Sequence, residues 1–527
     1  MDAPAIHKRR WWILGTLVLS LIIVVLDTSI LNVALKTIQA ELGASQSQLE
    51  WAIAAYILTF AGLLLMWGIL GDRMGRRRIL ILGFVLFGLA SLASAYATSP
   101  AQLIAARAFL GVGGAAVMPT TLSIISAVFD PAERPKAIGI WAASVGFGVA
   151  VGPITGGALL ERFWWGSVFL INVPIVLLGL VAIMTIVPES RDPNPGRLDP
   201  VGVLLSMAGL VLVIFGIIAG GQHADWLRPV VWTTMLLGVA LLAIFVWYES
   251  RSDHPAIDVR LFRDPRLRSA VLSIGTAFFA LIGGLFITSF YVQIVRGYSP
   301  LEAGLLFLPM AVAQTLSAFG SAALVTRYGA RTVSVTGLLL ISATFIGFLG
   351  LGVDTPIWYL ETLFFVQGAG TALVIPPATE VIMAALPREK AGAGAALGNV
   401  MRHVGGGLGV AVLGSVLSTH YRTAMDPWLA ALADPVRAVA GESIGGTFAV
   451  AGLFDDNTAA ALRERSLEAF VDAMHLAALG AALITLFGLF AVLRWMPPST
   501  AATLASGRAD PKPGGDPLTA NAKNANQ

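Results

Sequence analysis

Cysteine is absent from this sequence of 527 residues, and charged residues make up only 12% of it. Without cysteine, the chain cannot form disulfides, thiolate metal sites or a cysteine nucleophile. A soluble domain carries roughly 25% charged residues, so much of the surface of this protein must face something other than water. The formal net charge of +3 is too small to indicate a nucleic-acid partner.

Motifs for nucleotide and metal chemistry are also missing. No lysine follows a glycine, so the chain has no phosphate-binding loop of the GK[ST] type. The six histidines are scattered, and no HExxH pattern is present. We therefore expect a protein without cofactor or metal that is not an enzyme, and any active transport would have to use an ion gradient.

Long apolar stretches alternate with short polar loops along most of the chain. Each stretch is long enough to cross a bilayer as a helix, and no barrel-like alternation is present. The first stretch is too long to be the core of a signal peptide. We predict an all-α integral membrane fold with fourteen spans, at residues 11–35, 49–70, 79–98, 101–128, 136–160, 166–187, 200–219, 230–248, 268–294, 302–325, 333–352, 357–386, 391–418 and 470–495.

Lysine and arginine are concentrated in alternate loops, which places the N- and C-termini in the cytoplasm of a cell-membrane protein. Two loops also repeat. The sequence DRMGRR at 72–77 is echoed by TRYGAR at 326–331, and PAERPK at 131–136 by PREK at 387–390. Repeated halves are typical of transporters.

The repeat divides the chain into segments. We predict an N-terminal six-helix half at 1–187, two inserted helices with linkers at 188–267, and a C-terminal six-helix half at 268–496. Residues 419–469 form an outer loop whose helix-like stretches begin at Asp426 and Asn457, both good N-cap residues. The tail at 497–527 has a composition typical of disorder.

Charged residues within spans are informative because each costs roughly 2.5–3.5 kcal/mol at the bilayer centre. Asp27 lies about 13 Å from the outer end of its span and Arg107 about 10 Å from the end of its own. The similar depths predict a pair. Such a carboxylate could exchange a proton for a substrate, and a static ion pair is the alternative.

Other polar residues lie in the later spans. Glu361 and Gln367 are candidate cavity residues, although Glu361 could instead extend to the membrane interface. Glu380 could pair with Arg402 across one short loop, for a structural or a coupling role. The ninth span is aromatic, and its rings could line an adaptable apolar pocket or simply pack in the core or against lipid: Phe286, Phe290 and Tyr291.

Four motifs together resemble the major facilitator superfamily, specifically its fourteen-span branch of drug:proton antiporters. Residues 26–35 read LDTSILNVAL, like the first-span motif, and residues 107–115 read RAFLGVGGA, like the fourth-span motif whose arginine is implicated in proton transfer. Residues 68–78 read GILGDRMGRRR, like the loop motif, and carry Gly71, Asp72, Arg73, Gly75 and Arg77. Residues 152–157 read GPITGG, like the fifth-span antiporter motif, and carry Gly152, Pro153, Gly156 and Gly157.

The resemblance implies a monomeric, proton-coupled exporter of amphiphilic drugs that works by alternating access, with spans 1, 4, 9 and 12 lining the cavity. Its expected partners are small amphiphilic substrates, protons and the lipid bilayer. An uptake symporter of the same fold is one rival, against which the fifth-span motif argues. An exporter of lipids or lipid intermediates is another, and a membrane enzyme or receptor is a third.

The chain departs from the cation exporters of this branch, some of which carry extra acids in spans 2, 10 and 13. Here those places hold Ala54, no acid at all, and Asn399 with His403. We therefore predict a preference for monovalent lipophilic cations or neutral compounds over dications, because each added charge is costly to bury. The sequence MRHVGG at 401–406 is more similar to antibiotic exporters of the branch.

Overall fold

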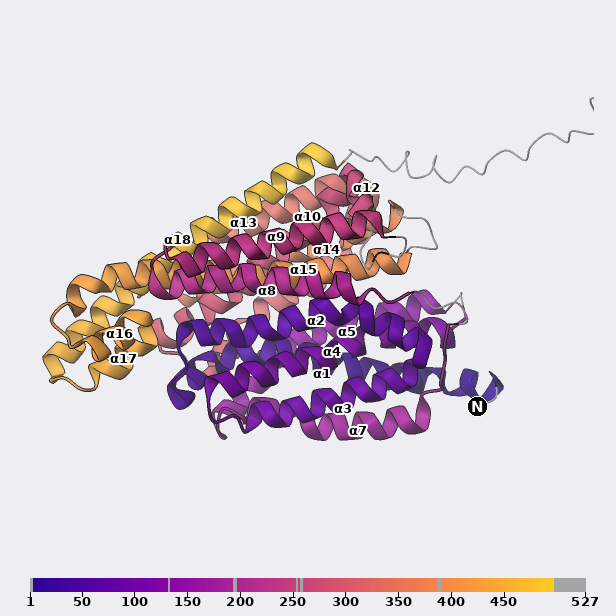
Figure 1. Cartoon of the computed structure of the whole chain (residues 1–527), viewed down its shortest axis with the longest axis horizontal. Coiled ribbons are helices and arrows are strands. Elements are labelled where there is room, and N and C mark those ends of the chain that lie inside the picture. Colours follow the sequence, from indigo (N-terminus) through magenta and orange to yellow (C-terminus); the bar gives the residue numbers. More distant parts are fainter. Residues whose placement is uncertain are drawn as a thin grey trace, which may run out of the picture.

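The computed structural model describes residues 3–130, 133–192, 197–252, 255, 259–385 and 391–496, and their regular secondary structure is helical (Figure 1). Within these residues, fourteen helices are long and apolar enough to cross a membrane, which confirms the predicted number. The tail at 497–527 and the loop sequence at 387–390 lie outside the described residues.

The N-terminal helices pack mainly with one another. They include two broken segments, α6 and α7, that together make the sixth span. Their bounds are α1 (Ala3–Leu42), α2 (Gln46–Met74), α3 (Arg76–Ala95), α4 (Pro100–Val128), α5 (Arg134–Leu160), α6 (Ser167–Leu170) and α7 (Asn172–Ile186).

The C-terminal helices form the second bundle, which also carries a small helical cap beyond the membrane. Their bounds are α10 (Pro265–Phe290), η2 (Tyr291–Val295), α11 (Pro300–Leu306), α12 (Leu308–Tyr328), α13 (Ala330–Phe348), α14 (Ile357–Ala384), α15 (Ala391–Leu429), α16 (Asp434–Glu442), α17 (Ile444–Ala451) and α18 (Asp456–Trp495).

The two inserted helices form a hairpin, α8 (Pro200–His223) and α9 (Pro229–Arg251), followed by the short η1 (Val259–Arg263). Helix α8 packs against α2 of one half and α15 of the other. It is therefore a bridge between the halves, and it lies between them in Figure 1. The Oγ atom of Ser415 donates to the carbonyl of Ile217 at 2.9 Å, which fixes α8 to α15.

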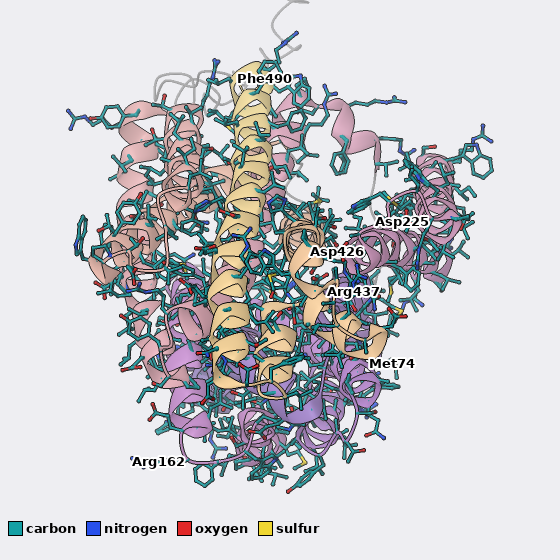
Figure 2. The ribbon with its side chains drawn as sticks, turned by 90° about the vertical axis from the view of Figure 1, so that its left-hand side faces the viewer. Met74, Arg162, Asp225, Asp426, Arg437 and Phe490 are labelled. Atoms are coloured by element: carbon teal, nitrogen blue, oxygen red, sulfur yellow. The ribbon has the colours of Figure 1, made fainter. Side chains whose placement is uncertain are left out.

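The outer loop is helical, as predicted, but its helix starts differ. Helix α15 continues past the membrane to Leu429, so Asp426 lies inside a helix and pairs with Arg437 of α16 at 2.6 Å (Figure 2). Helix α18 begins at Asp456, and Asp455 is its N-cap because its side chain accepts from the amide of Thr458. The sequence offered several adjacent polar residues here, and propensity alone could not choose among them.

We call the face where α1 begins the N-terminal side, and the face that carries α16 and α17 the far side (Figure 1). Hydrogen bonds between the two bundles lie toward the far side. The Lys36 ammonium donates to the carbonyl of Gln293 at 2.7 Å, and Ser299 donates to Glu161 at 3.0 Å. The bundles are thus joined on the far side.

Candidate functional site: a buried ion pair between the helices of the N-terminal half

Asp27 of α1 and Arg107 of α4 form an ion pair inside the N-terminal bundle. The Nη1 atom of Arg107 lies 2.5 Å from Oδ2 of Asp27, and the two side chains are 1% and 0% exposed. Arg107 also donates from Nε to the carbonyl of Ala52 at 3.2 Å, and its guanidinium lies 4.5 Å from the ring centroid of Tyr56. The predicted juxtaposition is therefore confirmed, while its role in proton transfer stays a prediction.

Asn172, at the first residue of α7, completes this cluster. Its Nδ2 donates to Oδ1 of Asp27 at 2.9 Å and to the hydroxyl of Ser91 at 3.2 Å. Both residues are fully buried. The sequence analysis missed them because it searched the spans for charged side chains. An asparagine inside the apolar run around residue 172 was the available signal.

The cluster can change protonation state without losing all its bonds. Each carboxylate oxygen of Asp27 accepts one hydrogen bond, Oδ2 from Arg107 and Oδ1 from Asn172. A proton on Asp27 would break the ion pair, yet Arg107 would keep the carbonyl of Ala52 and the ring of Tyr56 as partners. Burying a cation that keeps such partners costs less free energy than burying an isolated cation.

The fifth-span motif lies where α5 meets both α1 and the other half. A Cβ atom on Gly152 would lie 1.9 Å from Oγ of Ser29, and one on Gly156 would lie 2.4 Å from Ile30, both on α1. A Cβ atom on Gly157 would lie 2.4 Å from Cα of Leu301, at the start of α11. These glycines therefore allow close helix packing at the far-side contact, next to the helix that carries Asp27. Pro153 lies inside α5, and its carbonyl faces Gly304 of α11.

The loop motif between α2 and α3 is held by the segment after α7. Gly75 has φ +117°, a conformation that favours glycine, and a Cβ atom there would lie 2.7 Å from the carboxylate of Glu189. That carboxylate accepts from the amide of Arg77 at 3.1 Å. Asp72 pairs with Arg76 at 2.8 Å, and its carbonyl accepts from the amide of Asp192. Asp72 therefore binds within its own half here.

Two other residues of the loop motif lie on α2. A Cβ atom on Gly71 would lie 3.1 Å from Cγ2 of Thr120 on α4. The absence of a side chain at Gly71 therefore allows α2 and α4 to pack closely. Arg73 lies in the last turn of α2.

The aromatic residues proposed to line a pocket are packed in the interior. Phe286 and Phe290 contact each other edge to face at 5.4 Å, and the hydroxyl of Tyr291 donates to the carbonyl of Gly352 at 2.7 Å. All three are at most 2% exposed. In this conformation the accessible ring of α10 is Phe278, which is partly exposed. The three rings are thus packed away at the closed far side in this conformation, and their pocket role stays a prediction.

The polar candidates of α14 are separated from one another. Gln367 is buried, and its Oε1 has no hydrogen-bond partner among the described residues. Glu361 is partly buried one turn into the helix from the far side. Glu380 is exposed near the N-terminal side.

The predicted pair of Glu380 with Arg402 is wrong. Arg402, on α15, forms no ion pair with any described residue, and its guanidinium lies 5.5 Å from the ring centroid of Phe278. The two residues flank the same loop in sequence, but Glu380 is exposed and the two side chains form no ion pair in this structure. Depth in the membrane was predictable, whereas the facing directions of two helices were not.

An apolar cavity of ≈ 350 Å³ lies beside the inserted hairpin. Its walls come from α2, α8, α9, η1 and α15, and Ser206 is the polar residue among them. Across the described ranges, no group of three or more His, Cys, Asp or Glu side chains is placed to bind a metal.

Comparison with known proteins decides the family. The profile of the Major Facilitator Superfamily matches residues 17–410. The chain belongs to this superfamily. It is 36% identical to the multidrug efflux pump LfrA of Mycolicibacterium smegmatis, over 91% of this chain and 94% of that protein. It is 40% identical to the methyl viologen resistance protein SmvA of Salmonella typhimurium, over 78% of this chain and 83% of that protein.

The fold of this major facilitator chain is similar to that of a solved bacterial homologue of the human lysosomal transporter Spinster, in an inward-facing and unoccupied conformation. The TM-score is 0.65 with 17% identity, covering 93% of this chain and 98% of the other. At this identity the likeness concerns the fold. The resemblance found from sequence motifs is thereby confirmed at the level of family and architecture.

Proposed function

We propose that this major facilitator chain exports amphiphilic small molecules, including antibiotics, in exchange for protons. The observation that carries the proposal is the buried pair of Asp27 and Arg107, held by Asn172 and placed next to the close-packed fifth-span motif. Relatives of similar length are named as a multidrug efflux pump and a methyl viologen resistance protein, which supports drugs as the substrate class.

The proposed cycle alternates between two arrangements of the bundles. With the N-terminus in the cytoplasm, the far side is outside, and the present contacts correspond to an inward-facing state. A compound enters between the bundles from the cytoplasm or the inner leaflet. After the bundles rock apart on the far side, a proton reaches Asp27, weakens its bond to Arg107 and favours release of the compound. The protein acts as a multi-pass monomer in the cell membrane.

The test compares Asp27→Asn with Asp225→Asn in a pump-deficient bacterial host. Asp225 lies half-exposed at the turn between α8 and α9 and serves as a matched control (Figure 2). Protection is measured against ethidium, a lipophilic monocation, and chloramphenicol, a neutral amphiphile, at equal protein levels. The amide cannot bind or release a proton, so we expect Asp27→Asn to lose protection and Asp225→Asn to keep it. Wild-type protection by Asp27→Asn would refute the coupling role.

A second candidate is export of a lipid or lipid intermediate, which the apolar cavity beside α8 and α9 favours. Everted membrane vesicles distinguish the two. Export of drugs gives uptake of ethidium that collapses when the pH gradient is removed. Lipid export instead gives transfer of a fluorescent lipid with no uptake of ethidium, and a symporter would move its substrate in the opposite direction.

A further inference from the structure

Arg402 lies near the middle of the membrane, on the helix of the C-terminal half that faces the N-terminal half. The neighbouring His403 stacks on Phe60, with ring centroids 4.3 Å apart. Phe60 is midway between the ends of α2, so this contact fixes the depth of His403 and of Arg402 beside it. A charge at this depth usually faces a polar partner or a water-filled cavity.

The direction of Arg402 follows from the neighbours of α15. Gly405 and Gly409 pack on the backbone of α10, at Gly275 and Phe279. On another side, His403 contacts α2. Successive residues on a helix are about 100° apart. Arg402 lies one turn before Gly406, where a Cβ atom would lie 3.1 Å from Ile282 of α10, so its side chain lies on the side of α15 that meets the partly exposed edge of α10 formed by Phe278 and Ile282. The apolar cavity is lined by Met401 and Val404, so it lies on a different face of α15.

Arg402 has no anionic partner within the part of the chain that the structure describes. No carboxylate lies within ion-pair distance, its Nε has no hydrogen-bond partner, and the contact that remains is the ring of Phe278 at 5.5 Å. Both side chains are partly exposed. The charge of Asp27 cannot compensate, because it is already neutralised by Arg107. This edge of α10 thus meets an arginine whose natural complement is absent from the described residues.

We propose that Arg402 binds an acidic group of the transported compound, while Phe278 contacts the apolar body next to that group. A guanidinium binds a carboxylate through two parallel hydrogen bonds, and phenolates and enolates offer the same kind of oxygen. The substrates would therefore include amphiphiles with one acidic oxygen, as monoanions or as zwitterions. This inference rests on the proposed export function and adds a class of compounds to its substrates.

The test uses three probes that share one fluorescent body and differ in charge: pyrenebutyrate, pyrenebutyramide and pyrenebutylamine. Binding to purified protein in lipid nanodiscs is titrated for the wild type, Arg402→Gln and Arg402→Lys. For the wild type we expect the acid to bind roughly ten- to a hundredfold more tightly than the amide, as a hydrogen-bonded charge pair does, and the amine to bind most weakly.

Arg402→Gln should bring the affinities for the acid and the amide close to each other, and Gly146→Ala, which lies outside the proposed site, should keep the wild-type ratio. Arg402→Lys should restore part of the preference, because it keeps the charge without the paired donors. Wild-type protein that binds the acid no more tightly than the amide would overturn the inference without any variant. An Arg402→Gln variant that keeps the wild-type ratio of affinities for the acid and the amide would also overturn the inference. If the acid is preferred but no probe is transported by proteoliposomes under a pH gradient, the proposed export function fails while the binding inference stands.

Discussion

The contact between Gly157 and Leu301 predicts how the two conformations can be shifted. A methyl group at position 157 would lie 2.4 Å from Cα of Leu301 and 2.5 Å from the carbonyl oxygen of Pro300. Both are backbone atoms that cannot rotate away, and ordinary contact begins at 3.4 Å. Gly157→Ala should therefore force the bundles about 1 Å apart on the far side.

Overpacking of this kind costs roughly 1–3 kcal/mol. The cost applies to the state closed on the far side and disappears when that side opens. The population ratio of the two states should therefore shift by about 5- to 150-fold toward the far-side-open state. Gly146→Ala is the matched control on the same helix, because a Cβ atom there has nothing within 4 Å. Both variants gain the same helix propensity.

The assay measures distances between spin labels attached to introduced cysteines, which is simple because the chain has none of its own. Met74 and Tyr328, at 53% and 51% exposure, occupy equivalent places on the N-terminal side of the two halves. Tyr96 and Leu349 are exposed on the far side. Gly157→Ala should shorten the first distance and lengthen the second. Equal distance distributions in Gly157→Ala and Gly146→Ala would refute the reasoning.

Two further predictions concern the polar contacts of the N-terminal half. Asn172→Ala removes a buried hydrogen-bond donor to the carboxylate of Asp27, so the free energy of unfolding should fall by about 1–3 kcal/mol, and unchanged stability in thermal unfolding would show that this bond contributes little. Asp72→Asn should break the pair with Arg76 and any contact that Asp72 makes with the other half when the N-terminal side closes. We expect that change to favour the present state and to lengthen the distance from Met74 to Tyr328, and an unaltered distance would contradict it.

Much of the fold was predictable because membrane insertion sets a length and an apolar composition for each helix. The number of spans and the pairing of Asp27 with Arg107 follow from depth along the helices, which the sequence encodes directly. The boundaries of the outer helices did not follow, because several polar residues near Asp455 could each cap a helix. Propensity ranks these residues too closely to choose one.

The rest of the site depends on which way helices face, and the sequence does not encode that directly. Phe286 and Phe278 belong to one aromatic helix, but the first is buried at the closed side and the second is accessible. Glu380 and Arg402 have compatible depths but form no ion pair, Glu380 being exposed and Arg402 partly buried. Asn172 was missed for another reason. Its side chain is uncharged, so its burial carries a smaller penalty and a weaker signal than that of an acid.

The proton site and the proposed acid-binding site are joined by aromatic rings in contact. Arg107 lies 4.5 Å from the ring centroid of Tyr56, and the rings of Tyr56 and Phe60 are 5.8 Å apart. Phe60 in turn stacks on His403 at 4.3 Å, in the other half. If Asp27 takes up a proton, we expect Arg107 to strengthen its contact with Tyr56 and a shift of that ring to reach Phe60, because packed side chains have few alternative positions. The same helix turn that carries His403 carries Arg402, so this chain of contacts is a physical route by which a change of protonation in one half would alter the proposed binding site in the other.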